Sequence, residues 1–339
     1  MTRSLVVQTS FLGDVVLTTP LVAHLAMQGP TDVVCTPMAS TLLANNPDIR
    51  EIIVYDKRAA DRGLRGFMRL ASRLRAGRYD VAYHAQGSAR SGALTFAARI
   101  PDRVGFSTSA GRRFYTECVV PIDNLHHAAR LLSLGTRGSA RDTSPADIRP
   151  RLYPGDAERA AVDALLVANH ATNDALVALA PGSIWATKRW PYFRSLAGEL
   201  GRDARIVVVG SDADCELAAE IIAATKGHAI DATGRLSLLG SAELVRRAML
   251  LVTNDSAPLH LASAMNTPTV VVFGPTVPEF GFGPLAEHAV VVGHPSLPCR
   301  PCDRHGPRRC PLGHWRCMRE ITSDVVASRA RELLASRKP

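Results

Sequence analysis

The chain is poor in aromatic residues, which make up 5% of its 339 residues, and it has no apolar run of the roughly 18 residues that a membrane-spanning helix needs. Its first residues lack the successive charged, apolar and small-residue regions of a signal peptide, so we expect a cytoplasmic protein. It also lacks zinc-finger spacing and the aromatic pair of an RNA-binding sheet. With the low aromatic content, these absences argue against a nucleic-acid partner.

The composition is otherwise typical of a soluble globular protein. With 46% apolar residues and more residues than one hydrophobic core usually supports, the chain should form two packed domains. The formal net charge of +9 at pH 7 favours an anionic partner. A phosphorylated substrate and an anionic membrane surface both fit, and the net charge does not choose between them.

Strand-like and helix-like segments alternate along both halves of the chain. The apolar runs typical of strands are residues 5–7, 32–35, 52–55, 81–84, 176–180, 206–209, 251–253 and 269–273. Each half therefore predicts a parallel sheet covered by helices on both faces. A stretch rich in Pro, Asp and Ser at 142–156 separates the halves, and we expect α/β domains at 1–165 and 166–322 with a C-terminal helix at 323–339. Ligands of such sheets bind at the carboxyl ends of the strands, so the active site should lie between the halves.

A first candidate site follows the first predicted strand, in the sequence Thr9-Ser10-Phe11-Leu12-Gly13-Asp14. Gly13 permits a tight turn, and Asp14 then begins a helix at the carboxyl edge of the sheet. A carboxylate in this place can accept a proton from an acceptor hydroxyl. Asp is also a favoured N-cap residue, so a purely structural role explains the same sequence.

A second candidate site is the polar loop after the strand at 176–180. It contains Lys188 and Arg189 and ends at Pro191, a residue favoured in the first turn of a helix. We expect this loop to lie over the cleft between the domains, where its two cations would neutralise a diphosphate. An ordinary basic surface loop is the alternative.

A third candidate site follows the strand at 251–253. Asn254, Asp255 and Ser256 are all good helix caps, and the free N–H groups of the helix that they begin can bind an anion. His260 lies in the first turn of this helix, where it either faces the same ligand or packs into the core. A fourth candidate, the turn at 273–276, ends a strand and can hold a nucleotide through backbone groups.

These four elements, in this order, resemble the successive motifs of glycosyltransferase family 9, the heptosyltransferases. The motifs are Gly13-Asp14, Lys188-Arg189-Trp190-Pro191, Asn254-Asp255-Ser256-Ala257-Pro258-Leu259-His260 and Phe273-Gly274-Pro275-Thr276. The resemblance covers residues 4–322, nearly the whole chain. It implies a GT-B fold, in which two doubly wound parallel-sheet domains face each other across a cleft. It also implies inverting transfer of a heptose from ADP-L-glycero-D-manno-heptose, with no metal required for catalysis.

The resemblance implies roles for individual residues. Asp14 matches the proposed general base, on an acceptor-side loop with Ser10 and Gly13, and Lys188 matches the lysine that contacts the donor phosphates. The other residues implied to bind the donor are Asp255, Ser256, Ala257 and His260, with Glu216 as the carboxylate that holds the donor ribose. Ala257 stands where the family usually has glycine. Alanine fits without strain if the position is helical, whereas a positive φ would require a different donor loop.

The implied partners are an ADP-heptose donor and the lipopolysaccharide inner core, with addition of the second heptose favoured. The acceptor is an anionic glycolipid, so we expect a peripheral enzyme on the inner face of the inner membrane. A heptosyltransferase that modifies a protein or another envelope glycan would use the same donor site. A catalytically silent nucleotide-sugar-binding protein would have no use for Asp14. A nicotinamide-dependent dehydrogenase is disfavoured because the turn at 9–14 lacks the G-x-G-x-x-G spacing.

Four of the seven cysteines lie in one short stretch, the cysteine segment (residues 299–317); they are Cys299, Cys302, Cys310 and Cys317. In a cytosolic protein such a cluster indicates metal before disulfides, and four thiolates suit structural zinc or iron. The spacing is not that of a standard zinc ribbon, so reduced cysteines packed as small apolar side chains are the alternative. Similar cysteine-rich tails occur in the second-heptose branch of the family.

Basic residues dominate between Lys57 and Arg78, where Asp61 is the only acidic residue. Read as a helix, the stretch has a basic stripe of Arg62, Arg65, Arg69 and Arg73 and an apolar stripe of Leu64, Phe67, Ala71 and Leu74. The basic stripe fits anionic lipid headgroups or the phosphates and carboxylates of the inner core. A solvated helix face is the alternative.

Overall fold

The computed structural model describes residues 1–139 and 143–335, which form two compact units, Met1–Tyr153 and Pro154–Pro339. The boundary that we expected after residue 165 falls inside helix α6 (Asp156–Ala168). The first residue of the stretch at 142–156 and the last four of the expected C-terminal helix, 336–339, lie outside the described residues.

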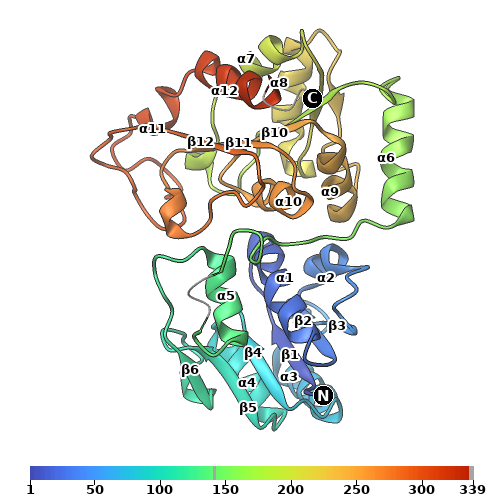
Figure 1. The fold of residues 1–339 in the computed structure, drawn as a ribbon, viewed down its shortest axis with the longest axis vertical. Coiled ribbons are helices and arrows are strands. Elements are labelled where there is room, and N and C mark those ends of the chain that lie inside the picture. The colour runs from blue at the N-terminus through green and yellow to red at the C-terminus, as the bar shows by residue number, and fades with distance from the viewer. Residues whose placement is uncertain (140–142, 336–339) are drawn as a thin grey trace. The chain divides into compact units, whose positions relative to one another are not determined.

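Unit 1 is built on a parallel six-stranded sheet of order β3-β2-β1-β4-β5-β6, drawn in blue to green in Figure 1. Its strands are β1 (Ser4–Val7), β2 (Thr31–Cys35), β3 (Glu51–Val54), β4 (Val81–His84), β5 (Asp102–Phe106) and β6 (Glu117–Val119). Its helices are α1 (Leu12–Ala26), α2 (Pro37–Leu43), α3 (Gly63–Ala76), α4 (Ala89–Ala97) and α5 (His127–Gly135), with the short η1 (Arg112–Phe114). All residues of β1, β2 and β4 are buried, which explains their nearly continuous apolar sequences.

Unit 2 repeats this plan with the order β12-β11-β10-β7-β8-β9, again all parallel. Its strands are β7 (Leu176–Ala180), β8 (Arg205–Val208), β9 (Ile230–Asp231), β10 (Leu250–Asn254), β11 (Thr269–Phe273) and β12 (Ala289–Gly293). Besides α6, its helices are α7 (Phe193–Leu200), α8 (Cys215–Ala224), α9 (Leu238–Arg247), α10 (Ala257–Met265), α11 (Arg316–Arg319) and α12 (Ser323–Ala335). Three short turns of 3-10 helix complete it: η3 (Ala186–Lys188), η4 (Asp212–Asp214) and η5 (Pro278–Phe280).

Side chains of β7 alternate between two cores, one on each face of the sheet. Val177 and Leu179 pack with α7, α8 and α12, whereas Leu176, Ala178 and Ala180 pack with α6, α9 and α10. Helix α12 is therefore part of the core of unit 2 and not a separate C-terminal element. Its buried residues, Val326, Ala327, Ala330 and Leu333, recur at the spacing of one helical face.

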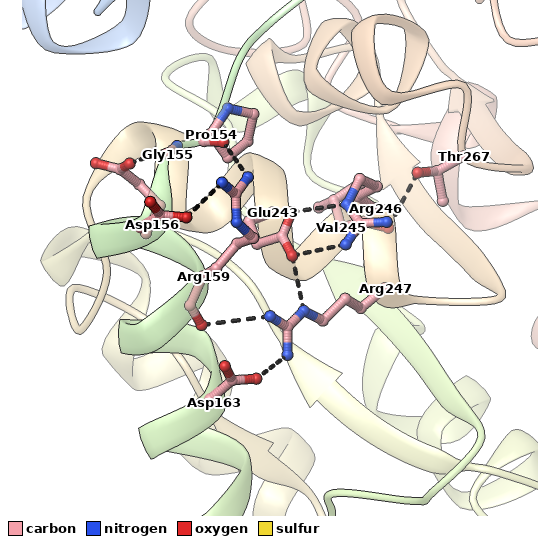
Figure 2. A network of polar contacts seen from close by, with 11 residues as sticks. Pro154, Gly155, Asp156, Arg159, Asp163, Glu243, Val245, Arg246, Arg247 and Thr267 are labelled. Carbon is pink, nitrogen blue, oxygen red and sulfur yellow. Dashed lines mark hydrogen bonds and ion pairs between the residues drawn. The ribbon is translucent and has the colours of Figure 1, made fainter. Parts of the chain in front are cut away.

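Helix α6 is attached to the rest of unit 2 by a network of charged side chains around the buried Glu243, shown in Figure 2. Arg246 holds both carboxylate oxygens of Glu243, and Nε of Arg247 donates to Oε1 at 2.8 Å. The same guanidinium pairs with Asp163 of α6 and donates to the backbone oxygen of Arg159. Burial alone would raise the pKa of Glu243, but the hydrogen bonds from the two arginines outweigh it, so the pKa lies below its usual value. This network explains why the boundary precedes α6.

Both sheets share one doubly wound strand order, 3-2-1-4-5-6 when the strands of each unit are counted along the chain. In such sheets the order reverses at a switch point, where the connections on the two sides diverge and leave a crevice at the carboxyl ends of the strands. The switch point lies between β1 and β4 in unit 1 and between β7 and β10 in unit 2. These two places are where a ligand site is expected.

Candidate functional site

Asp14 lies at the switch point of unit 1, in the first turn of α1. The N-cap of α1 is Phe11, so Asp14 is the third helical residue and the N-cap interpretation is wrong. Gly13 is also helical, and the chain bends at Ser10 rather than in the turn that we expected at Gly13. The sequence therefore places Asp14 correctly at the start of the helix that follows β1 but misjudges the local turn.

The carboxylate of Asp14 is held by two polar side chains. Ser10 Oγ donates a hydrogen bond to Oδ2 at 2.5 Å, and Nε2 of His127, the first residue of α5, lies 3.5 Å from Oδ1. The side chains of Asp14 and His127 are 21% and 19% exposed. An oriented carboxylate that solvent can reach is able to accept a proton from a bound hydroxyl group.

Two cations lie near the same edge of the unit 1 sheet. Lys57 Nζ donates to Thr9 Oγ1 at 2.7 Å, and Arg90 Nε donates to the hydroxyl of Tyr55 at 2.6 Å. Both cationic groups are 5.6 Å from the centre of the Tyr55 ring, and burial, then the charge of Arg90, lowers the pKa of Lys57. In the part of the chain that the structure describes, neither cation pairs with an acidic side chain. Their charge is available to an anion.

At the switch point of unit 2, Lys188 is locked into a buried polar cluster. Its Nζ donates to Asp255 Oδ2 at 2.6 Å, and Thr276 Oγ1 donates to the same oxygen at 2.6 Å. The side chains of Lys188 and Asp255 are only 10% and 9% exposed. The second, third and fourth sequence motifs thus meet at one point, although Lys188 is buried and not on an open loop.

Asn254 joins the two strands of this switch point. Its Oδ1 accepts from the backbone N–H of Trp190 at 3.0 Å, and its Nδ2 donates to the carbonyl of Pro181 at 2.8 Å. The loop 181–190 is therefore fixed at both ends by one side chain at the end of β10. Trp190 anchors the same loop by donating from Nε1 to the carbonyl of Ile321 at 2.7 Å.

Helix α10 begins directly after this cluster. Ser256 is its N-cap but makes no side-chain capping bond; its hydroxyl instead lies 3.5 Å from the carbonyl of Asn254. Ala257 is the first helical residue, so alanine in place of the usual glycine fits without strain. His260 is buried in α10, with its ring edge-on to Phe282 at 6.3 Å between centroids.

A carboxylate that packs against the loop after β7 belongs to Asp214, two residues before the Glu216 that the resemblance implies. A Cβ atom added to Gly182 would lie 2.2 Å from Asp214 Oδ1, so this carboxylate packs directly against the backbone of the loop. Ser211 holds it, donating from its backbone N–H and from its hydroxyl to Oδ2 at 2.9 Å each. Glu216 is exposed in the first turn of α8.

Among the described residues, the cysteine segment forms no group of metal ligands, and some of its cysteines pack as in the alternative interpretation. Cys317 is buried in the core of unit 2, Cys299 packs against that core, and Cys302 Sγ donates to the carbonyl of Cys299 at 3.2 Å. Burial raises the pKa of Cys310, but backbone N–H groups of residues 312–315 donate to its sulfur and lower the pKa overall. Burial and then the charges of Cys302, Cys310 and Cys299 raise the pKa of Cys317, so the four thiols lie near one another. Within residues 1–139 and 143–335, however, no three His, Cys, Asp or Glu side chains are grouped to hold a metal ion.

Helix α3 carries the predicted basic stripe, but two of its arginines form ion pairs with acidic side chains. Arg69 Nη2 lies 2.7 Å from Asp61 Oδ1, and Arg73 Nη2 lies 2.7 Å from Glu51 Oε1, both in exposed ion pairs. Exposed pairs of this kind contribute little free energy. None of the helices among the described residues is both long and apolar enough to cross a membrane.

Several residues that the structure brings to these sites carry no local sequence signal. His127 is 113 positions from Asp14, and Thr276 reaches Asp255 only because β10 and β11 are neighbours. Lys57 and Arg90 meet at Tyr55 from separate segments. Of these residues, only Thr276 lies in a predicted motif, the turn at 273–276. That prediction concerned its backbone and not its hydroxyl.

Comparisons with known proteins agree with the fold and with the motifs. The sequence model described as glycosyltransferase family 9 (heptosyltransferase) matches residues 67–314. The chain is 26% identical over 309 residues to lipopolysaccharide heptosyltransferase 2 of Salmonella typhimurium, covering 86% of this chain and 87% of that protein. It is 29% identical over 319 residues to lipopolysaccharide heptosyltransferase 1 of Pseudomonas aeruginosa, covering 88% and 86%.

Among solved structures, the glycosyl transferase family 9 protein of Veillonella parvula has a TM-score of 0.87 at 25% identity, covering 99% of this chain and 98% of that one. The E. coli ADP-heptose lipopolysaccharide heptosyltransferase II has a TM-score of 0.82 at 24% identity, covering 100% of both chains. Two parallel-sheet α/β units and these neighbours confirm the predicted GT-B fold class.

Proposed function

Because the chain belongs to glycosyltransferase family 9, we propose that it transfers a heptose from ADP-L-glycero-D-manno-heptose to the lipopolysaccharide inner core, as the second heptose. The names of its curated relatives support heptose transfer. The observation that carries the proposal is the meeting of Lys188, Asp255 and Thr276 at the switch point of unit 2. A buried lysine beside the start of a helix is an environment suited to a diphosphate.

On the donor side, Lys188 and the positive end of the α10 dipole attract the phosphates of ADP. The start of a helix carries partial positive charge, and Ser256 provides no side-chain cap there. Pro258 has no N–H and the N–H of Leu259 donates to the carbonyl of Ser256, so the dipole rather than a set of free N–H groups supplies the attraction. Asp255 holds the lysine in place before the donor binds. Asp214 is the carboxylate that we assign to the donor ribose, because it packs against the loop after β7.

On the acceptor side, Asp14 takes the proton of the attacking hydroxyl. The acceptor oxygen forms a bond to the anomeric carbon while the bond from that carbon to the phosphate oxygen of ADP breaks, so one displacement inverts the configuration. The electron pair leaves with ADP, whose new charge Lys188 offsets. Ser10 and His127 orient the carboxylate for this transfer. The cations Lys57 and Arg90 suit the acidic groups of the core.

We also propose that unit 1 binds an anionic membrane surface through α3, which would place a cytoplasmic enzyme peripherally on the inner membrane. Leu64 and Met68 are 74% and 49% exposed, and the neighbouring Arg62 and Arg65 are exposed as well. Apolar side chains flanked by arginines suit the interface of an anionic bilayer. Replacing Arg62 and Arg65 with Ser should weaken sedimentation with phosphatidylglycerol vesicles, whereas unchanged sedimentation would remove this part of the proposal.

The test of the proposed function is turnover of the purified protein with ADP-heptose and a core lipopolysaccharide that ends in the first heptose. ADP release and the mass of the acceptor are followed together. A gain of one heptose is the expected result. ADP release without a heavier acceptor would point to a different acceptor, such as a protein or another envelope glycan, and binding without turnover would point to a silent binding protein.

A further inference from the structure

Arg300, in the cysteine segment, makes several hydrogen bonds to backbone carbonyls. Its guanidinium donates to the carbonyl oxygens of Gly274 at 2.7 Å, Phe273 at 3.2 Å, Thr276 at 3.1 Å and His294 at 2.8 Å. Three of these four carbonyls belong to the turn at 273–276 that follows β11. The planar group with its five N–H donors can serve several carbonyls at once, which a lysine ammonium cannot do in the same geometry.

The surroundings of Arg300 leave it little freedom. A Cβ atom added to Gly293 would lie 2.7 Å from Nη2 of Arg300, so the guanidinium packs against bare backbone at the end of β12. On the other side of the turn, Gly274 is in close contact with Met318, whose Cε lies 2.6 Å from the place of an added Cβ. Burial lowers the pKa of Arg300, although the group stays charged at neutral pH.

The turn that Arg300 holds carries one member of the Lys188 cluster. Thr276 donates from its hydroxyl to Asp255 Oδ2, the same oxygen that accepts from Lys188 Nζ. If the turn moved, Asp255 would keep its hydrogen bond from Lys188 but lose the one from Thr276. The carboxylate would then pair with Lys188 more strongly and leave less of the positive charge for a ligand.

The rest of the cysteine segment supports the same region from neighbouring points. The backbone N–H of Cys302 donates to the carbonyl of Pro275 at 2.8 Å. The hydroxyl of Thr187, next to Lys188, donates to the carbonyl of Pro307. A Cβ atom on Gly306 would lie 3.2 Å from Cε of Lys188, so the segment also limits the lysine side chain.

We propose that Arg300 is a positioning residue for donor binding, which fixes the turn at 273–276 so that Thr276 shares Asp255 with Lys188 and leaves the ammonium oriented toward the diphosphate. This role rests on the proposed function, since it concerns the nucleotide side of the same site. It acts through Thr276, and Arg300 itself need not touch the donor.

The test is a double-mutant cycle on ADP binding, measured by calorimetry with the full chain. Arg300→Lys keeps the charge but loses most of the carbonyl contacts, and Thr276→Val removes the hydroxyl. Each should weaken ADP binding about tenfold, the effect of losing a hydrogen bond to a charged group. The double variant should be little weaker than the worse single variant, because both act through one path. Arg309→Lys, an exposed arginine of the same segment, is the matched control and should bind ADP normally.

Steady-state kinetics separate positioning from a general loss of folded protein. Arg300→Lys should raise the donor KM about tenfold and leave kcat and the acceptor KM nearly unchanged, whereas partial unfolding would lower kcat alone. Normal ADP binding by Arg300→Lys, additive effects in the cycle, or global unfolding of that variant would each overturn the positioning role. Failure of the unsubstituted protein to bind ADP would instead overturn the proposed function.

Discussion

The two units have the same strand order but hold their principal charged residues in opposite ways. In unit 1, Asp14 is 21% exposed and contacts Ser10 and His127. In unit 2, Lys188 is 10% exposed and held by Asp255, which also accepts a hydrogen bond from Thr276. We interpret the difference chemically: a carboxylate that must exchange a proton has to be reached by the reacting hydroxyl, whereas a cation that only attracts charge works best when it is held in place.

The same comparison separates charges to which we assign a role in the proposed chemistry from a charge held for stability. Glu243 is as buried as any charged residue of unit 2, but its partners attach α6 to α9 and lie away from the ends of β7 and β10. Lys188 and Glu243 can therefore be compared as two buried charged residues. Loss of the first should affect donor binding, and loss of the second only stability. Substitutions at Asp14, Lys188, Glu243 and Asp214 can break or sharpen the comparison.

The largest effect is expected from Asp14→Asn. The amide keeps the shape of the side chain but cannot accept the proton, so kcat should fall by about 10²- to 10⁴-fold, the usual contribution of a general base. Steady-state turnover with saturating ADP-heptose measures this. Asp123→Asn, at an exposed position of unit 1, is the control. Near-normal turnover of Asp14→Asn would exclude the base role.

Lys188→Met should cost stability as well as donor binding. It leaves Asp255 buried without its cation, and breaking a buried pair in this way lowers the free energy of unfolding by about 3 kcal/mol. Urea denaturation at pH 7 measures the loss. Adding Asp255→Asn to the same chain should recover part of it, since the uncompensated charge is then gone. A single variant as stable as the original protein would show that the pair is not buried in solution.

Glu243→Gln should lower the free energy of unfolding by about 2 kcal/mol, because hydrogen bonds to a charged group are lost in a buried place. The donor KM should not change, in contrast to Lys188→Met. Urea denaturation and donor kinetics on the same preparation test both expectations. A raised donor KM would mean that the network of Figure 2 reaches the candidate site.

The contribution of Glu243 should also depend on pH. Its pKa in the folded protein is below the ordinary value of 4.5, so the stabilisation is fully present above that value and is lost as the pH falls through the lowered pKa. The stability difference between the original protein and Glu243→Gln should therefore shrink in acid. Urea denaturation across the acid range provides the measurement, and a difference that stays constant would contradict the assigned pKa direction.

The smallest effect is expected from the pair Asp214→Asn and Glu216→Gln. Asp214 lies against the loop after β7, and the loss of one hydrogen bond to a charged group should raise the donor KM about tenfold or less. Glu216 is exposed on α8 and should tolerate its change. Donor KM values of the two variants, measured side by side, decide between the carboxylates. A larger effect at Glu216 would restore the assignment made from the sequence.

The elements that the sequence predicted well are those with uninterrupted apolar runs. Strands β7 and β11 are buried on both faces, so their sequences identify them. The strands β5, β6 and β9 were not predicted, because they are short, polar or at the sheet edge, and their pairing partners decide their structure. Strand β12 was missed although its apolar run was readable.

The candidate site likewise has parts that the sequence predicted and parts that it did not. The motifs placed Asp14, Lys188 and Asp255 in the segments that follow strands, because strand, loop and cap signals are local. The contacts that orient these residues are not local. Arg300 reaches the turn at 273–276 from a later loop, and no spacing rule connects them. The choice between Asp214 and Glu216, two residues apart, depended on the turn before α8.

The most direct measurement is the affinity for ADP of the original protein, Asp14→Asn and Lys188→Met, compared in one calorimetric series. If unit 2 binds the nucleotide and unit 1 supplies the base, Asp14→Asn should bind ADP as the original protein does, while Lys188→Met should bind it about a hundredfold more weakly or not at all. If both variants lost ADP binding equally, or if Lys188→Met kept it, the division of roles between the two units would be contradicted.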